Sequence, residues 1–374
     1  MISKLYFALF STFQVTTVPS PPVINVTPPQ AIAPAKNLMI HYTAESAKCS
    51  DGTLDLSAFM DSSVALNVIR QNTLLQEVEI AFRIDETGRA LGIARSSTDQ
   101  YSASIADIAP VVAAARFNPG KARFGCTVKY VSRASEIPEA SLNAAFEYLT
   151  FPNMGRQQAV FDRVKPENST CFNGAPAVLT RSYPDFSKVP ATPGRNDWSM
   201  TQFDINASGK PVNVRTVGGT GNNDLDRASR DAVARSKFAK EATKGCLYPY
   251  WRVAGTVAAP ASPEDDAFRP EHANCPKEIE WATQNPATYP DRFRKRYIEG
   301  WAVIVFDVAP WGSTGNVRIA AAEPAAEFGI AAKQVVEVRK VKNAGQGYTG
   351  CVERVRFRMS KPKTEEAGEE TKPF

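Results

Sequence analysis

Six cysteines divide this chain at nearly regular intervals, and this spacing restricts its fold more than any other feature. Taken in consecutive pairs, the cysteines are 77, 75 and 76 residues apart, namely Cys49 and Cys126, Cys171 and Cys246, and Cys275 and Cys351. Six cysteines allow many pairings, and the near-equal gaps favour this one. Each disulfide would close a loop of about 75 residues and stabilise its own segment by about 4–5 kcal/mol. The alternative is six unrelated buried thiols, whereas a metal site would need close pairs such as Cys-x-x-Cys, which the sequence lacks.

The N-terminal residues and the cysteines together indicate an exported protein. Lys4 precedes the apolar run 5–13, which is typical of a short signal peptide over residues 1–17. The Pro-rich stretch after it predicts an extended tether over residues 18–39. Because structural disulfides need an oxidising compartment, we expect the protein to be exported from the cytoplasm. No run reaches the roughly 20 apolar residues of a membrane span, and a net charge of +5 is too small to indicate nucleic acid as a partner.

The regular gaps coincide with an internal repeat. Each gap contains a strand-like segment of alternating apolar and polar residues, with a central phenylalanine followed by a glycine turn. The central phenylalanine lies 33, 32 and 31 residues after the first cysteine of its pair, and 44, 43 and 45 residues before the second. A glycine precedes the second cysteine in every case. The aligned residues are Phe82, Phe203 and Phe306 in the strands, and Gly88, Gly209 and Gly315 in the turns.

Each repeat reads as strand, turn, strand, helix and strand. The helices are predicted from apolar residues at helical spacing, with Asp224 as the N-cap of the second and Pro110 delaying or kinking the first. A helix on one face of a small antiparallel sheet is an α+β fold, so we predict three tandem α+β domains, each with its final strand at a sheet edge. The predicted helices are 104–117, 224–238 and 327–341, and the final strands are 127–133, 247–255 and 352–359. The predicted domains are 40–133, 150–256 and 266–359, followed by a disordered tail over 360–374.

Several short motifs surround the central strand of the third repeat. They are YPDRFRKRYIEG (289–300), the strand WAVIVFDV (301–308), a glycine turn, NVRIAAAEP (316–324) and a helix ending in EVRKV (337–341). The second repeat keeps SYP (182–184) and the QFDI strand, and the first keeps ARFNPG (115–120). Together these motifs resemble the C-terminal domain of TonB-family energy transducers, in three tandem copies. Three copies instead of one, and three disulfides, depart from the usual family pattern.

This resemblance implies a periplasmic domain that binds a short extended peptide of an outer-membrane transporter by adding it to a sheet edge. An edge strand offers unpaired backbone N–H and C=O groups, and its alternating side chains supply selectivity. We therefore expect a protein-binding protein of the cell envelope. Its expected partners are envelope proteins, including TonB-dependent transporters, and the implied process is transmembrane transport. Arginines alternate with apolar residues in the final strand of the third repeat, and the expected peptide-binding residues are Val352, Arg354, Val355, Arg356 and Phe357.

Other interpretations stay open from the sequence alone. The protein could be a structural or regulatory envelope protein whose modules pack together without a peptide ligand. The basic burst ahead of the strand 301–308 either protects a strand edge from pairing or forms a docking patch for an acidic segment or anionic lipid headgroups at a membrane surface. We expect no enzyme, cofactor or metal, because His41 and His272 lack an evident acid partner and bridged cysteines leave no thiolate. The basic burst consists of Arg292, Arg294, Lys295 and Arg296.

Overall fold

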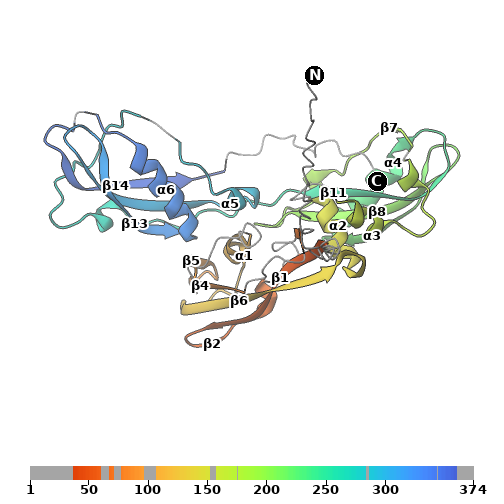
Figure 1. The fold of residues 1–374 in the computed structure, drawn as a ribbon, viewed down its shortest axis with the longest axis horizontal. Helices are drawn as coiled ribbons and strands as arrows, with labels where there is room; N and C mark the ends of the chain where they lie inside the picture. The colour runs from red at the N-terminus through yellow and green to blue at the C-terminus, as the bar shows by residue number, and fades with distance from the viewer. Residues whose placement is uncertain are drawn as a thin grey trace, which may run out of the picture. The chain divides into compact units, whose positions relative to one another are not determined.

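The structure is a computed structural model, and it describes residues 37–59, 67–70, 77–96, 107–151, 157–174, 176–283, 286–342 and 344–359. The predicted signal peptide (1–17), nearly all of the predicted tether and the predicted tail (360–374) lie outside these residues. Backbone contacts group residues 36–374 into one unit. The described residues form three main antiparallel sheets and one short strand pair, together with several helices (Figure 1). This confirms the α+β class, whereas the predicted domain boundaries stay a prediction.

The first sheet is the largest, with its strands in the order β2-β1-β6-β4-β5 and β3 paired to β1. Its strands are β1 (Asn37–Cys49), β2 (Gly52–Thr53), β3 (Asn67–Arg70), β4 (Val78–Ile84), β5 (Ala90–Arg95) and β6 (Arg123–Glu136). Alternate residues of β4, including Ile80 and Phe82, are buried in the core. The helix α1 (Ile108–Ala114) packs against β5. Pro110 lies in the first turn of α1, where a proline removes no helical hydrogen bond. This explains why the helix, predicted over 104–117, begins only at Ile108.

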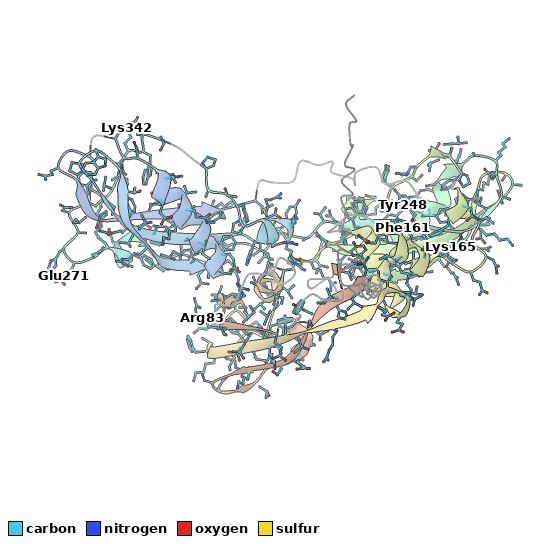
Figure 2. The ribbon with its side chains drawn as sticks, in the orientation of Figure 1. Arg83, Phe161, Lys165, Tyr248, Glu271 and Lys342 are labelled. Atoms are coloured by element: carbon cyan, nitrogen blue, oxygen red, sulfur yellow. A yellow bond between two sulfur atoms is a disulfide. The ribbon has the colours of Figure 1, made fainter. Side chains whose placement is uncertain are left out.

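The second sheet is covered on both faces. Its strand order is β11-β8-β9, with β8 (Asp197–Ile205), β9 (Pro211–Gly219) and β11 (Thr243–Arg252). Trp198 and Met200 of β8 face α2 (Leu142–Thr150) and α3 (Gln158–Val164), where Phe161 packs against the same cluster (Figure 2). Phe203 and Ile205 point the other way, toward α4 (Asn223–Arg235). The short strands β7 (Val178–Thr180) and β10 (Lys237–Phe238) pair separately.

The cap of α4 differs from the prediction. Asn222 is the N-cap residue, and its side-chain oxygen accepts the N–H of Leu225 at 3.0 Å. Asp224, the predicted N-cap, lies in the first turn, so that prediction was wrong. Both residue types suit this helix end, because a side-chain oxygen can satisfy a free N–H and a carboxylate complements the positive end of the helix.

The third sheet has the order β13-β12-β14, with β12 (Gly300–Val308), β13 (Thr314–Glu323) and β14 (Tyr348–Phe357). Alternate residues of β12, such as Ile304 and Phe306, pack with Phe328 of α6 (Ala326–Val338) on one face. The opposite face is covered by the chain that enters this sheet. There the short helix η6 (Asp265–Phe268) contacts both β12 and β14, and the indole N–H of Trp301 donates to the carbonyl of Pro260 at 2.9 Å.

A glycine with a left-handed backbone recurs in the turn that follows β4, β8 and β12, which is the first turn of each predicted repeat. Gly88, Gly209 and Gly312 have φ values of +80°, +77° and +87°. An added Cβ would lie 2.0, 2.2 and 2.3 Å from the backbone oxygens of Phe117, Phe238 and Val341. The alignment of Gly315 with Gly88 and Gly209 was therefore wrong, because Gly312 has their conformation and their contact. Gly315 has open space around it and no left-handed φ.

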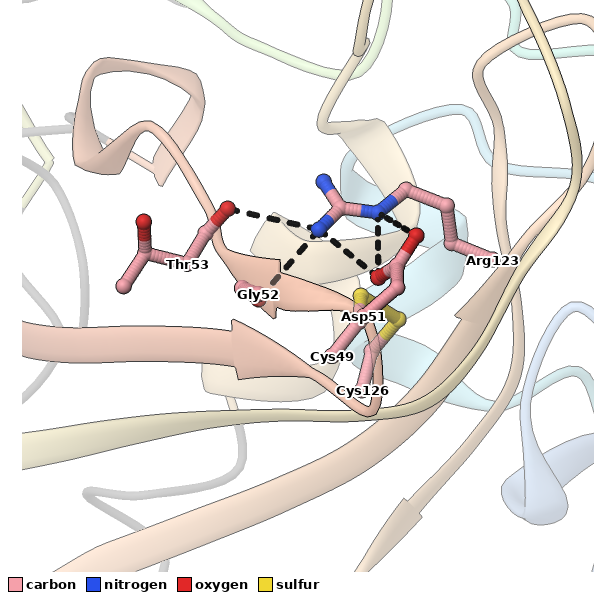
Figure 3. The surroundings of a disulfide bond; sticks show 6 residues. All are labelled: Cys49, Asp51, Gly52, Thr53, Arg123 and Cys126. Atoms are coloured by element: carbon pink, nitrogen blue, oxygen red, sulfur yellow. Dashed lines mark hydrogen bonds and ion pairs between the residues drawn. A yellow bond between two sulfur atoms is a disulfide. The ribbon is translucent and has the colours of Figure 1, made fainter.

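The disulfides join Cys49 to Cys126, Cys171 to Cys246, and Cys275 to Cys351, which are the pairs that the regular spacing favours. Figure 3 shows the first of them at the end of β1. There Arg123 of β6 donates to Asp51, with its Nε 2.8 Å from Oδ1, and to the carbonyls of Gly52 and Thr53. Structural disulfides are typical of oxidising compartments, so the fold is compatible with an extracytoplasmic protein. Within the described ranges, no helix has the length and apolar character needed to cross a membrane.

Candidate functional site

The final strand of the first repeat does not lie at a sheet edge, contrary to the prediction. β6 is flanked by β4 on one side and by β1 on the other. β1 runs antiparallel to β6 from the pair Leu38–Glu136 to the pair Lys48–Thr127. The reason is the segment 37–49, which was not predicted as a strand but buries Ile40 and is joined to β6 by its last residue, Cys49. This edge is therefore already occupied by a strand of the same chain.

Within the described ranges, β14, the final strand of the third repeat, pairs only with β12 and so forms an edge of its sheet. The N–H of Met359, just beyond the strand, donates to Oε1 of Glu299 on the β12 side at 2.9 Å. Neighbouring residues of an antiparallel strand direct their backbone groups to opposite sides. The odd-numbered residues 351–357 therefore face β12, and Val352, Arg354 and Arg356 direct their N–H and C=O groups outward. Among the described residues, no backbone group bonds to these outward groups.

The open part of the edge has a definite beginning. At the start of β14, the carbonyl of Thr349 accepts the N–H groups of Asn274 and Cys275 at 3.2 and 3.3 Å. The N–H of Thr349 donates to Oδ1 of Asn274 at 2.7 Å. The pairing of β14 with β12 shifts register between Tyr348 and Cys351, which is why Thr349 is outward although Cys351 faces β12. The chain leading to the third disulfide thus closes this first outward position, and the open part begins at Val352. Neither Asn274 nor Glu299 was singled out from the sequence, although Glu299 belongs to the IEG motif.

The five predicted peptide-binding residues have different surroundings. Val355 and Phe357 are buried against the α6 side of the sheet, so their side chains belong to the core. Arg354 has only 7% of its side chain exposed, because it pairs with Asp265 and donates to Oγ of Ser262 at 2.9 Å. Val352 is half-buried and Arg356 is exposed. The edge can therefore offer a partner strand the backbone groups of Val352, Arg354 and Arg356. Of the five predicted side chains, that of Arg356 is the most exposed.

One half-buried acid lies beside the candidate edge on the helix side of the sheet. Glu353 of β14 accepts from Arg339, with Oε1 and Nη1 3.2 Å apart. Burial raises the pKa of Glu353, and the charge of Arg339 opposes this shift. Because this pair faces away from the outward backbone groups and is already satisfied, it serves the packing of β14 and is not a recognition group.

A groove of about 590 Å³ adjoins the end of β14. It is lined by residues 258–262 of the entering chain, residues 299–301 at the start of β12, and Arg356, Arg358 and Met359. Both arginines are exposed. We call this the β14 groove. Arg356 belongs both to the open part of the edge and to the groove lining, so a segment bound beside Arg356 would lie next to the groove.

β11, the final strand of the second repeat, is also an edge strand, since β8 is its only partner strand in the described part of the chain. Its edge is less suited to a partner strand. Pro249 lies three residues after the second cysteine, as Arg354 does in β14, and a proline has no N–H to donate. Two tyrosines of β11 are also engaged by the chain that precedes the second sheet. The guanidinium of Arg181 lies 4.9 Å from the ring centre of Tyr248, which Figure 2 labels, and the hydroxyl of Tyr250 donates to the carbonyl of Ser182 at 2.6 Å.

The basic burst is mostly paired within the chain. Three of its cations lie in the short helix α5 (Asp291–Lys295). Arg294 and Lys295 both pair with Asp291, at 2.6 and 2.9 Å, and Arg292 pairs with Asp107 at 2.9 Å. Arg296 is buried and donates to the carbonyl of Gly194 at 3.2 Å. This arrangement favours a structural role over a docking patch for an acidic segment or lipid headgroups.

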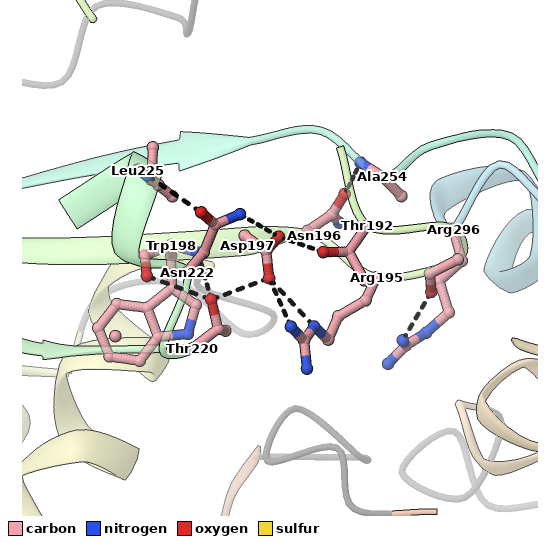
Figure 4. A network of polar contacts seen from close by, with 12 residues as sticks. Thr192, Arg195, Asn196, Asp197, Trp198, Thr220, Asn222, Leu225, Ala254 and Arg296 are labelled. Atoms are coloured by element: carbon pink, nitrogen blue, oxygen red, sulfur yellow. Dashed lines mark hydrogen bonds and ion pairs between the residues drawn. The ribbon is translucent and has the colours of Figure 1, made fainter. Parts of the chain in front are cut away.

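A buried polar network surrounds Asp197, at the start of β8 (Figure 4). Its carboxylate pairs with Arg195 at 3.0 Å and accepts from the side chains of Thr192, Thr220 and Asn222. Every partner is a donor, so the buried charge is satisfied and the network fixes the start of β8 next to the cap of α4. In the described ranges, no group of three or more His, Cys, Asp or Glu side chains is placed to hold a metal ion.

Comparisons with known proteins add little to this geometry. No known protein-family profile matches the chain, and no curated protein matches it. Among solved structures, the chain is similar to one titled "Solution NMR structure of Pseudomonas aeruginosa TonB CTD". The identity is 16%, the match covers 25% of this chain and 100% of that chain, and the TM-score is 0.22. A likeness of this size is too weak to assign a function, and the open edge of β14 is the stronger indication.

Proposed function

We propose that this chain is a protein-binding protein of the cell envelope, located in the periplasm, that adds an extended segment of a partner to the open side of β14. The observation that carries the proposal is the contrast between two final strands. β6 has β1 paired along its outer side, whereas no strand of the described residues pairs along the outer side of β14. Three outward residues of β14 offer N–H and C=O groups with the alternation that an added strand needs.

We propose further that the three regions are copies of one unit, similar to the C-terminal domain of TonB. The support comes from positions that recur in all three. Each has the left-handed glycine of the first turn, and each has a left-handed glycine just before the second cysteine, with φ of +59°, +68° and +68° at Gly125, Gly245 and Gly350. Outer-membrane TonB-dependent transporters are the proposed partner class, because they present extended segments in the periplasm.

A second candidate function is structural. Contacts between the first and third sheets favour it, since Arg83 of β4 pairs with Glu323 of β13 at 2.6 Å and the N–H of Ile93 donates to the carbonyl of Pro324 at 2.9 Å. An envelope protein whose modules pack together without a peptide ligand would need such contacts. These contacts involve neither the outward groups of β14 nor the β14 groove, so they leave the first proposal open.

Replacing Val352 with proline tests strand addition at β14. Val352→Pro removes one outward N–H, and a proline on the outer side of an edge strand is tolerated by the sheet itself. The probe is a fluorescein-labelled ten-residue peptide of alternating valine and glutamate, measured by fluorescence anisotropy with the full chain. We expect binding to weaken about tenfold, because one ladder hydrogen bond is lost and the proline ring obstructs the approach.

The matched control is Val352→Ala, which shortens the side chain but keeps the N–H and should bind the probe within about twofold of the original chain. Circular dichroism and intact disulfides confirm that both variants fold. Equal binding by the proline and alanine variants would show that the peptide does not pair with the outward side of β14.

A further inference from the structure

The β14 groove contains two cations that the fold does not neutralise. Arg356 and Arg358 line it, and among the described residues neither forms an ion pair or a side-chain hydrogen bond. Arg354, the preceding arginine on the same side of the strand, is different, because the chain entering the third sheet binds it through Asp265 and Ser262. The strand thus has one arginine used for folding and two left for a ligand.

One acid also lines the groove, and it is already engaged. Glu299 accepts the N–H of Met359 through Oε1 at 2.9 Å and the N–H of Ala259 through Oε2 at 3.4 Å. Its carboxylate therefore holds the two walls of the groove together. With two guanidinium groups and one carboxylate, the lining keeps a net positive charge. The remaining lining residues are uncharged.

The two arginines have the spacing of an added strand. Residues two apart in a strand point to the same face and lie about 6.6–6.8 Å apart. Side chains directly opposite each other on neighbouring strands lie about 4.5–5.5 Å apart at their Cβ atoms. Acidic residues at every second position of an added strand would therefore each meet one of the two arginines, Arg356 in β14 and Arg358 just beyond its last residue. A carboxylate that receives a guanidinium forms the stronger, charge-assisted type of hydrogen bond.

We propose that the β14 groove selects partner segments with acidic residues at alternate positions, and that Arg356 and Arg358 are the residues that recognise them. This inference rests on the proposed strand addition and adds the chemical class of the partner. The occupant is an acidic extended segment of another envelope protein. The chain also carries its own acidic stretch shortly after Arg358, with Glu365, Glu366, Glu369 and Glu370, and the test must separate that source from a partner.

The test compares two probes on the full chain. One is the labelled valine-glutamate peptide, and the other is the same peptide with glutamine in place of every glutamate. We expect the glutamate peptide to bind about tenfold more tightly, because partly exposed ion pairs each contribute at most about fivefold. The preference should shrink as sodium chloride rises from about 50 to 500 mM, because salt screens exposed charges.

Arg356→Gln combined with Arg358→Gln should abolish the preference while the glutamine peptide binds as before. The matched control, Arg294→Gln with Lys295→Gln, removes the same net charge from α5 and should leave the preference intact. Replacing the four tail glutamates with glutamine should not change binding of the glutamate peptide by more than about twofold if a partner is the occupant.

The outcomes separate the two proposals. If both peptides bind equally and Val352→Pro weakens both, strand addition stands and the selection of acidic segments is wrong. If the α5 variant, but not the β14 variant, loses the preference, the recognising cations have been misplaced. If neutralising the tail strengthens binding severalfold, the tail is the occupant and the partner assignment is overturned. If neither peptide binds, both proposals fail.

Discussion

Replacing Cys275 and Cys351 together with alanine is expected to destabilise the third sheet by about 4 kcal/mol. The disulfide closes a loop with a separation of 76 residues, and the chain-entropy model assigns about 4–5 kcal/mol to a loop of that length. Hydrogen exchange measured by mass spectrometry on peptides from β12 reports this directly. We expect their exchange through global opening to become about a thousandfold faster, which is the same free energy expressed as a rate ratio.

The control is the corresponding pair of substitutions at Cys171 and Cys246. Their disulfide lies in the core cluster of the second sheet, which is separate from the cluster that contains Cys275 and Cys351. Exchange in β12 should stay unchanged in that variant. Unchanged exchange in the Cys275 and Cys351 variant would mean that the third disulfide does not stabilise its own sheet.

Gly312→Ala is expected to destabilise the protein by about 3 kcal/mol. The backbone of Gly312 has a φ of +87°, and an added Cβ would lie 2.3 Å from the carbonyl oxygen of Val341. A left-handed backbone is unfavourable for alanine, and the close contact with a backbone atom requires the turn to move. Guanidinium unfolding followed by circular dichroism measures the change as a shift of the midpoint at constant slope.

Gly315→Ala is the matched substitution, three residues further along the same turn and strand. Gly315 has open space around it and an ordinary backbone, so we expect a change of less than about 0.5 kcal/mol. If the two alanine variants lost equal stability, the structural equivalence of Gly312 with Gly88 and Gly209 would be wrong.

Regular spacing made much of the fold predictable. The cysteine gaps led to the disulfide pairs now seen, because loops of nearly equal length in one chain indicate one repeated framework. The order strand, turn, strand, helix and strand in each repeat followed from periods of two and of 3.6 residues. The turn glycine of the third repeat was misplaced because WGSTG contains two glycines, and only the backbone conformation distinguishes Gly312 from Gly315.

The elements outside the repeated unit were missed for a physical reason. β1 is interrupted by a bulge between Ala44 and Ser46, which breaks the alternation that would reveal a strand. α2 lies almost entirely between the first two predicted domains and α3 lies near the start of the second, and the apolar residues of both make sense only against the second sheet. β1 matters most for function, because it turns the final strand of the first repeat into an interior strand. No local pattern in 127–133 could have shown that.

The candidate site was predictable only in part. The sequence showed that arginines alternate with apolar residues in β14, but it grouped Val355 and Phe357 with Arg356 as peptide-binding residues, whereas the structure buries the two apolar side chains and exposes Arg356. The sequence could not show that Arg354 would be bound by Asp265, because that contact joins residues that are far apart in the chain. The sequence also suggested that the cations of the basic burst are the exposed ones. In the structure those cations are paired, and Arg356 and Arg358 are exposed.

The central claim is that the outer side of β14 is open and receives a partner strand, and residue-resolved amide hydrogen exchange tests it most directly. In the free chain, the amides of Val352, Arg354 and Arg356 should exchange rapidly, while those of Glu353, Val355 and Phe357 are protected by β12. Saturation with the valine-glutamate peptide should protect the first three and leave the others unchanged. Slow exchange at Val352, Arg354 and Arg356 before any peptide is added, or no change at them in the complex, would contradict the claim.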